Sequence, residues 1–173
     1  ADFGYFGGGG PGPLSSVDRI DYSNDTATAS PKGPLSVARR SSAATGNSSF
    51  GYFGGGEPVP SGATVDRIDY SNDTATAAVK GPLSAATDYH AGTSSTTHGY
   101  RMGGRTPSEV STVDRIDYSN DTGTASVRGP LSSTNYRSYA ASGTTSFGYL
   151  FGGHRPSGYS TTTTDRIDYS NDS

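Results

Sequence analysis

The residues best suited to chemistry in this chain are charged groups that recur within one octapeptide. The octapeptide Asp-Arg-Ile-Asp-Tyr-Ser-Asn-Asp begins at Asp18, Asp66, Asp114 and Asp165. In its second copy, the carboxylates of Asp66, Asp69 and Asp73 offer the hard oxygen ligands that Ca²⁺ prefers. However, the octapeptide lacks the ligand spacing and the closing Glu of an EF-hand loop. We therefore favour a tight turn at Asn72 and Asp73 and expect no metal site, with calcium binding as the alternative.

One arginine occurs at the same place in every octapeptide. A ring of guanidinium groups facing a ligand would suit a carboxylate or a phosphate. The constant register favours instead a structural ion pair with an Asp of the same or a neighbouring unit. We predict such structural roles for the four arginines and for the second Asp of each octapeptide, namely Arg19, Arg67, Arg115, Arg166, Asp21, Asp69, Asp117 and Asp168.

The remaining residue types give little support for catalysis. The chain has no Cys, so it has neither a cysteine nucleophile nor a thiolate metal site. Its three histidines, His90, His98 and His154, occupy different places in the repeat and are not expected to converge on a metal. No Gly-x-Ser-x-Gly elbow accompanies the many Ser and Thr residues. We predict no catalytic residue, no cofactor and no enzymatic activity.

Ligand-binding residues are better supported than catalytic ones, and we expect them in the parts of the chain whose sequence differs between units. The stretch after each Gly pair varies most in sequence and in length, and insertions in repeat proteins map to loops on one face, often the binding face. The candidate ligand-binding residues in these loops are Arg105, Glu109, His154, Arg155 and Tyr159. A second candidate, expected to be exposed, combines residues 88–90 with residues 135–137 (Asp-Tyr-His and Asn-Tyr-Arg). Tyr, Arg and Asn suit a glycan, although plain solvated loops remain an equally good interpretation.

These loops belong to a repeat that occupies nearly the whole chain. The octapeptides are spaced by 48, 48 and 51 residues, and an aromatic-Gly-Tyr marker begins at Phe3, Phe50, His98 and Phe147. Residues 1–173 therefore form a single array of three full units and about two thirds of a fourth, with markers at 3–25, 50–73, 98–121 and 147–172. The sequence begins with Ala1, and we expect it to be processed or to be part of something longer.

Short β signals, rather than helical periodicity, recur within each unit. In the second unit we expect strands at 50–53, at 64–70 and at 74–78, the last two joined as a hairpin through Ser71, Asn72 and Asp73. Residues 81–84 (Gly-Pro-Leu-Ser) read as a crossing segment, because Pro cannot donate to a central ladder. The fourth strand of a unit is expected in the small-residue stretch before the next marker, such as 41–45 at the end of the first unit.

Composition narrows the class of protein further. Only 30% of the residues are hydrophobic, yet they recur at the same place in each unit, and 12 Tyr residues supply packing area. A pI of about 5.5 argues against nucleic acid as a partner. No apolar run is long enough to span a membrane, and the first residues do not resemble a signal peptide.

The order of these signals resembles the kelch repeat. The strand that ends in Gly-Gly, the apolar strand with its Tyr-Ser-Asn-Asp turn, and the Pro-containing segment followed by Arg39 match its pattern. This resemblance implies an all-β, kelch-like β-propeller of four-stranded blades, with about 3.5 repeats of ~48 residues per chain. The chain departs from the pattern where the usual Trp is missing and where Thr87 and Asn135 lie in place of Arg39.

The amino-acid sequence of the repeat also resembles virion structural proteins of marine cyanobacterial phages. Those proteins contain repeats and are similar to tail fibres. That resemblance implies a location on the virus particle and, as partners, other copies of the chain, other virion proteins and a host-surface glycan. The alternative is a secreted or cell-surface bacterial module for adhesion or carbohydrate binding. A propeller enzyme such as a copper oxidase is disfavoured by the missing Cys and the scattered His. Because 3.5 units are too few for a closed propeller, we expect another copy to complete it, or the chain to be part of a longer array.

Overall fold

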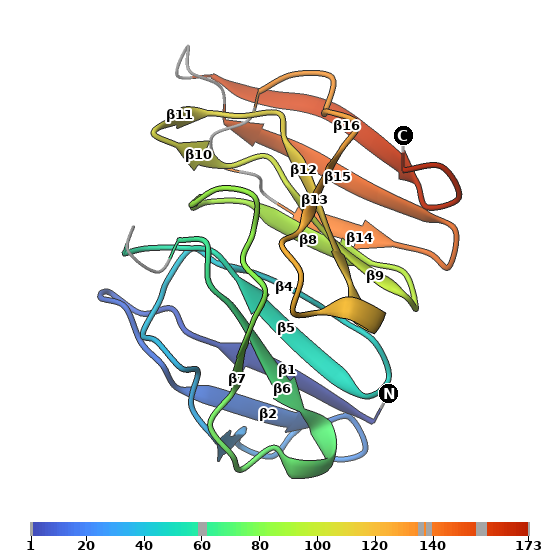
Figure 1. Ribbon diagram of the computed structural model, residues 1–173. Helices are drawn as coiled ribbons and strands as arrows, with labels where there is room; N and C mark the ends of the chain where they lie inside the picture. The colour runs from blue at the N-terminus through green and yellow to red at the C-terminus, as the bar shows by residue number, and fades with distance from the viewer. Residues whose placement is uncertain (1, 59–61, 135–136, 138–139, 155–158, 173) are drawn as a thin grey trace.

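The protein is all-β, as predicted, and its sheets follow one another in chain order (Figure 1). The computed structural model describes residues 2–58, 62–134, 137, 140–154 and 159–172. Within these ranges it has strands and short 3₁₀ turns but no α-helix. The first sheet has the order β1-β2-β3, formed by Phe3–Gly7, Val17–Asp21 and Ser30–Lys32. The second has the order β4-β5-β6-β7, formed by Ala43–Gly46, Phe50–Gly54, Val65–Asp69 and Ala78–Lys80.

The third and fourth sheets repeat this plan. The third has the order β13-β12-β9-β8, where β8 is Ala91–Ser94, β9 is His98–Met102, β12 is Val113–Asp117 and β13 is Ser126–Arg128. The fourth has the order β14-β15-β16, formed by Ala140–Gly143, Phe147–His154 and Ser160–Asp168. A small ribbon of β10 (Arg105–Thr106) and β11 (Ser108–Glu109) lies between β9 and β12 in the chain. The predicted strands at 41–45, 50–53 and 64–70 correspond to β4, β5 and β6. The strand at 41–45 was predicted to close the first unit, but it pairs with β5 and belongs to the second sheet.

The strand predicted at 74–78 was placed too early. The carboxylate of Asp69 accepts a hydrogen bond from the backbone N–H of Ser71 and holds a 3₁₀ turn at Tyr70–Asn72. The following residues then bond to the preceding unit instead of to β6, since the N–H of Ala77 donates to the carbonyl of Pro34. Only at Ala78 does the chain return to pair with β6. The predicted antiparallel pairing is therefore correct, and its position is shifted towards the C-terminus.

The second, third and fourth sheets meet through their first strands. β4 contacts β8, and β8 contacts β14, so that these strands of small residues lie side by side. The backbones come close because Gly92 has no side chain. A Cβ atom at Gly92 would lie 2.6 Å from the carbonyl oxygen of Ala44, closer than real Cβ contacts allow. The composition of these strands thus sets the spacing of the sheets.

An apolar cluster fills the space between each pair of sheets. Between the first and second sheets, for example, Val17, Leu35, Phe53 and Ile68 pack together, each at most 4% exposed. Equivalent clusters surround Val65 between the second and third sheets, and Leu150 between the third and fourth. The buried Leu35 comes from the predicted crossing segment, which places one large apolar side chain in each cluster. This arrangement explains how a chain with few apolar residues forms a core.

Beside each apolar cluster, one carboxylate binds several polar side chains of the facing sheet. Asp73 ends the second octapeptide and accepts hydrogen bonds from the Tyr5 hydroxyl at 2.9 Å and from Arg19 at 2.7 Å. Lys32 adds an ion pair at 3.5 Å. The next interface repeats the set at Asp121, with its partners Tyr52, Arg67 and Lys80. The last Asp of an octapeptide thus joins its own sheet to the preceding one.

Replacement of Asp121 with Asn is expected to lower the free energy of unfolding by about 2 kcal/mol, because bonds from two cations and a hydroxyl lose their charged acceptor. The matched control is Asp2→Asn, since Asp2 is an exposed carboxylate outside the octapeptides. Asp2→Asn should change the stability by less than about 0.5 kcal/mol. Urea unfolding followed by circular dichroism measures both, and equal effects would contradict the role given to Asp121.

Candidate functional site

Three of the four octapeptide arginines form ion pairs between sheets. Arg19 and Arg67 pair across sheet interfaces with Asp73 and Asp121, and Arg115 pairs in the same way with Asp172. Arg166 is exposed in the last sheet, with its guanidinium over the ring of Phe147 at 4.6 Å. The arginines therefore do not form a ring around one ligand.

The second Asp of each octapeptide is an N-terminal cap of the turn and not the ion-pair partner of the arginine. Its carboxylate accepts hydrogen bonds from the backbone N–H and the hydroxyl of the Ser two residues later, as Asp69 does from Ser71 at 2.9 and 2.7 Å. These bonds favour the charged form and lower the pKa of Asp69 below its usual value. The same bonds and the same direction of pKa are found at Asp21, Asp117 and Asp168.

The first Asp of two octapeptides is buried in an ion pair. Asp66 pairs with Arg39 at 3.0 Å, and both side chains are 0% exposed. In the next unit Thr87 stands in place of Arg39, and the cation comes instead from Arg101, the register partner of Asp114. Asp66, Asp69 and Asp73 thus each bind different protein groups rather than one cation. In the described part of the chain, no three His, Asp or Glu side chains gather as metal ligands would.

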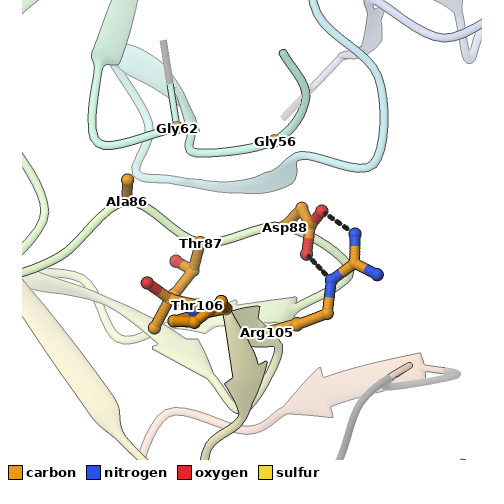
Figure 2. Close-up of a pocket in the computed structure, with 8 residues that line it drawn as sticks. Gly56, Gly62, Ala86, Thr87, Asp88, Arg105 and Thr106 are labelled. Carbon is orange, nitrogen blue, oxygen red and sulfur yellow. Dashed lines mark hydrogen bonds and ion pairs between the residues drawn. The ribbon is translucent and has the colours of Figure 1, made fainter. Parts of the chain in front are cut away.

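A cavity of about 310 Å³ opens between the divergent loops of the second and third units (Figure 2). Three segments form its walls: the loop after β5, the chain that crosses towards β8, and the β10–β11 ribbon. The backbone joins two of these walls, since Gly56 donates to the carbonyl of Thr87, and Thr87 donates to that of Gly62. The lining residues are Gly56, Gly62, Ala86, Thr87, Asp88, Arg105, Thr106 and Pro107.

Figure 2 shows the one ionic feature of this lining, the side chains of Asp88 and Arg105 pointing toward each other. Arg105 binds both carboxylate oxygens of Asp88, through Nε at 3.2 Å and Nη2 at 2.7 Å. One carboxylate oxygen of Glu57 lies 3.6 Å from the same guanidinium, and the other oxygen pairs with Arg40 at 2.6 Å. The cavity is therefore bordered by a chain of alternating charges that crosses from one unit to the next.

An aromatic ring extends this chain of charges towards the fourth sheet. The guanidinium of Arg105 lies 5.5 Å from the centre of the Tyr89 ring, and that of Arg137 lies 4.7 Å from it. Arg137 in turn forms a backbone bridge with His154 at the end of β15. The loop edges of three successive units are therefore in contact through one polar cluster.

The structure brings together three of the five predicted loop residues. Arg105 lines the cavity, Glu109 is its register partner across the β10–β11 ribbon, and His154 lies next to Arg137. Tyr159 precedes β16 and is 75% exposed. Arg155 lies outside the described residues.

The second candidate was expected to be exposed, and this expectation is wrong for two of its residues. Asp88 is 6% exposed because it pairs with Arg105, and His90 is 5% exposed because it points under the Gly54–Gly55 backbone. Arg137 joins the polar cluster through the ring of Tyr89. Asn135 and Tyr136 lie outside the described residues.

Sequence reasoning missed Glu57 and Arg40. Glu57 follows a Gly pair, as Arg105 and His154 do, so the period of the repeat alone would have identified it. Arg40 had no such signal, because it is placed by a bridge to Glu57 that continues the β4–β5 register past a bend. Arg40 also lowers the pKa of Glu57 below its usual value by donating a hydrogen bond to it. Near pH 7 Glu57, at the border of the cavity, is thus ionised, and its carboxylate accepts hydrogen bonds rather than delivers protons.

The described residues contain no helix long and apolar enough to cross a membrane. No protein-family model matches the chain, and no curated protein matches its sequence. Solved structures do match, 142 chains in all. One of them, described as "Structure of YjhT", has a TM-score of 0.75 at 14% sequence identity, and the match covers 91% of this chain and 50% of that one. The chain therefore spans about half the length of this neighbour, and the likeness concerns the fold alone.

Proposed function

We propose that the chain is a segment of a kelch-like propeller and serves as a non-catalytic structural component of a virus particle, such as a tail or fibre. We further propose that its cavity binds a glycan of the host surface. Successive antiparallel sheets, joined by the same bonds at each interface, support the propeller architecture. The fold match, which covers 91% of this chain and 50% of the matched structure, supports the proposal that this chain is a segment of a longer array of sheets.

The proposal of a binding function rests on the contrast between repeated and variable residues. The residues between sheets are repeated almost without change, whereas the residues around the cavity differ from unit to unit. Glu57, Arg105 and His154 occupy equivalent places in the repeat and have chemically different side chains. A cavity of about 310 Å³ with a carboxylate, a guanidinium and threonine hydroxyls has the size and the few convergent polar groups of a small-ligand site. The carboxylate of Asp88 can accept hydrogen bonds from sugar hydroxyls, and the guanidinium of Arg105 can donate them.

Binding of glycans is expected to depend on Arg105. Arg105→Ala removes the donor at the wall of the cavity and leaves Asp88 without its guanidinium, so the affinity for a glycan that the unmodified chain retains on an array should fall at least tenfold. The matched control is Arg40→Ala, which removes the other guanidinium beside Glu57 but no residue of the cavity lining. Titration calorimetry with the selected glycan measures both variants. If no glycan is retained, or if both variants bind equally, the cavity is not a glycan site.

The proposed location is tested separately. An antibody against the chain should detect it in purified particles and label their surface in electron microscopy. Detection in a bacterial envelope fraction, and not in particles, would favour the alternative of a cell-surface adhesion module.

A further inference from the structure

The first and fourth sheets each have one face that no other described residue covers. In the fourth sheet, Leu150 and Ile167 pack against the third sheet, so the alternating neighbours on β15 and β16 point to the other side. We call this surface the C-face; it carries Phe147, Tyr149, Phe151 and Arg166. The surface of the first sheet that points away from the second is the N-face, and it carries Phe6, Ile20, Tyr22 and Asp25.

Exposure shows that both faces lack a partner that the inner sheets have. Phe6 and Tyr22 on the N-face are 62% and 59% exposed, and Phe151 on the C-face is 42% exposed. Phe53, the residue of the second sheet equivalent to Phe6, is only 4% exposed because the first sheet covers it. Large aromatic side chains at these levels of exposure are typical of a surface made for association.

The chain contains three copies of the interface that would cover these faces. In the first, the ring of Tyr5 stacks on that of Tyr70 at 4.7 Å, and Arg19 pairs with Asp73 at 2.7 Å. The second and third copies repeat the stacked tyrosines at 4.6 and 4.8 Å and the Arg–Asp pair. One side of each interface thus supplies Tyr and Arg, and the other supplies Tyr and Asp.

The two free faces hold one half each of this interface. On the C-face, Tyr149 and Arg166 are register partners, as Tyr5 and Arg19 are. On the N-face, Tyr22 and Asp25 occupy the octapeptide positions of Tyr70 and Asp73. Within one molecule these faces belong to the sheets at opposite ends of the array (Figure 1). They can therefore meet only between molecules.

We propose that two copies of this chain bind each other head to tail, with the C-face of each copy on the N-face of the other. The charges select this arrangement, because Arg166 meets Asp25 only when unlike faces meet. A closed pair uses both faces of each copy and supplies eight sheets. It also agrees with the fold match, in which this chain covers 50% of the neighbouring structure. The proposal does not depend on glycan binding by the cavity.

The test is the mass of the 173-residue chain in solution, with charge reversals on each face. Sedimentation equilibrium at micromolar concentration should give twice the chain mass of 17.8 kDa. Arg166→Asp alone and Asp25→Arg alone should each weaken association about a hundredfold or more, because like charges then meet at both junctions. An equimolar mixture of the two variants should associate again, since it restores one original Arg–Asp pair and creates one reversed pair.

Two controls separate loss of association from loss of folding. Val127→Asp adds a charge at an exposed position outside both faces and should leave the mass unchanged. The recovery in the mixture also requires that both variants are folded. A monomer for the unmodified chain, an open ladder of higher masses, or a mixture that stays monomeric would overturn the proposal and show that the two faces have another occupant.

Discussion

Replacing Arg39 with Met is expected to lower the free energy of unfolding by about 3–5 kcal/mol, because it leaves the carboxylate of Asp66 buried without a cation. Both side chains are 0% exposed, so water cannot replace the lost partner. Arg39 also donates to the carbonyl oxygens of Gly55 and Thr64, which would lose a donor in the same place. Equilibrium unfolding in urea, followed by far-ultraviolet circular dichroism, measures the change.

The neighbouring Arg40 provides a matched control. Its side chain is 41% exposed and pairs with Glu57, so Arg40→Met should cost less than about 1 kcal/mol. The chain also suggests a rescue, since Thr87 and Arg101 occupy around Asp114 the repeat positions that Arg39 and Phe53 occupy around Asp66. The double variant Arg39→Thr with Phe53→Arg should therefore recover part of the stability lost in Arg39→Thr. If Arg39→Met and Arg40→Met lower the free energy of unfolding by similar amounts, the buried ion pair does not contribute more to stability than the exposed one.

A second large effect is expected from acid. His90 is 5% exposed, and its burial, together with the nearby charge of Arg101, lowers its pKa to about 3. Its Nε2 lies 2.9 Å from the carbonyl oxygen of Gly54, which can only accept, so this nitrogen carries the proton of the neutral ring. The unfolded chain binds a second proton below about pH 6.5, whereas the folded chain does so only near pH 3.

Stability should therefore be complete above about pH 6.5 and should fall with decreasing pH by up to ~1.4 kcal/mol per unit, or about 3 kcal/mol at pH 4. The capping carboxylates, whose pKa values are lowered, contribute to acid unfolding only below about pH 4–5, so the interval from pH 5 to 6.5 isolates the histidine. His90→Gln keeps a donor for Gly54 without a titrating ring and should flatten the curve in that interval. His98→Gln, a change at a half-buried histidine, should leave most of the slope. A slope that persists in His90→Gln would contradict this assignment.

Those parts of the fold that depend on local pattern could be predicted from the sequence. The period of the repeat, the strands at 50–53 and 64–70, and the turn at Asn72 all depend on neighbouring residues. The strand at 74–78 was misplaced because Ala77 bonds to Pro34 of the preceding unit, a contact that no local pattern reveals. The cation for Asp114 escaped prediction for another reason, since it comes from a strand residue of the same sheet, Arg101, and not from the crossing segment.

The site shows the same division. Variation between units indicated the loops that hold Arg105 and Glu109, and the structure shows a cavity lined by Arg105. The burial of Asp88 and His90 could not be predicted, because it results from the loop of one unit folding over the crossing segment of another. Charge alone suggested an exposed stretch there, and the ion pair with Arg105 explains why a carboxylate is buried.

The bonds at Asp73 and Asp121 also bear on how the molecule loses its structure. Each of these carboxylates joins a sheet to the one immediately before it, so the energy of the array is a sum over adjacent pairs. An inner sheet has two such neighbours and an end sheet has one. Opening should therefore begin at the ends and move inward, one sheet at a time, and a partner that caps both ends would protect the whole array by removing the places where opening starts.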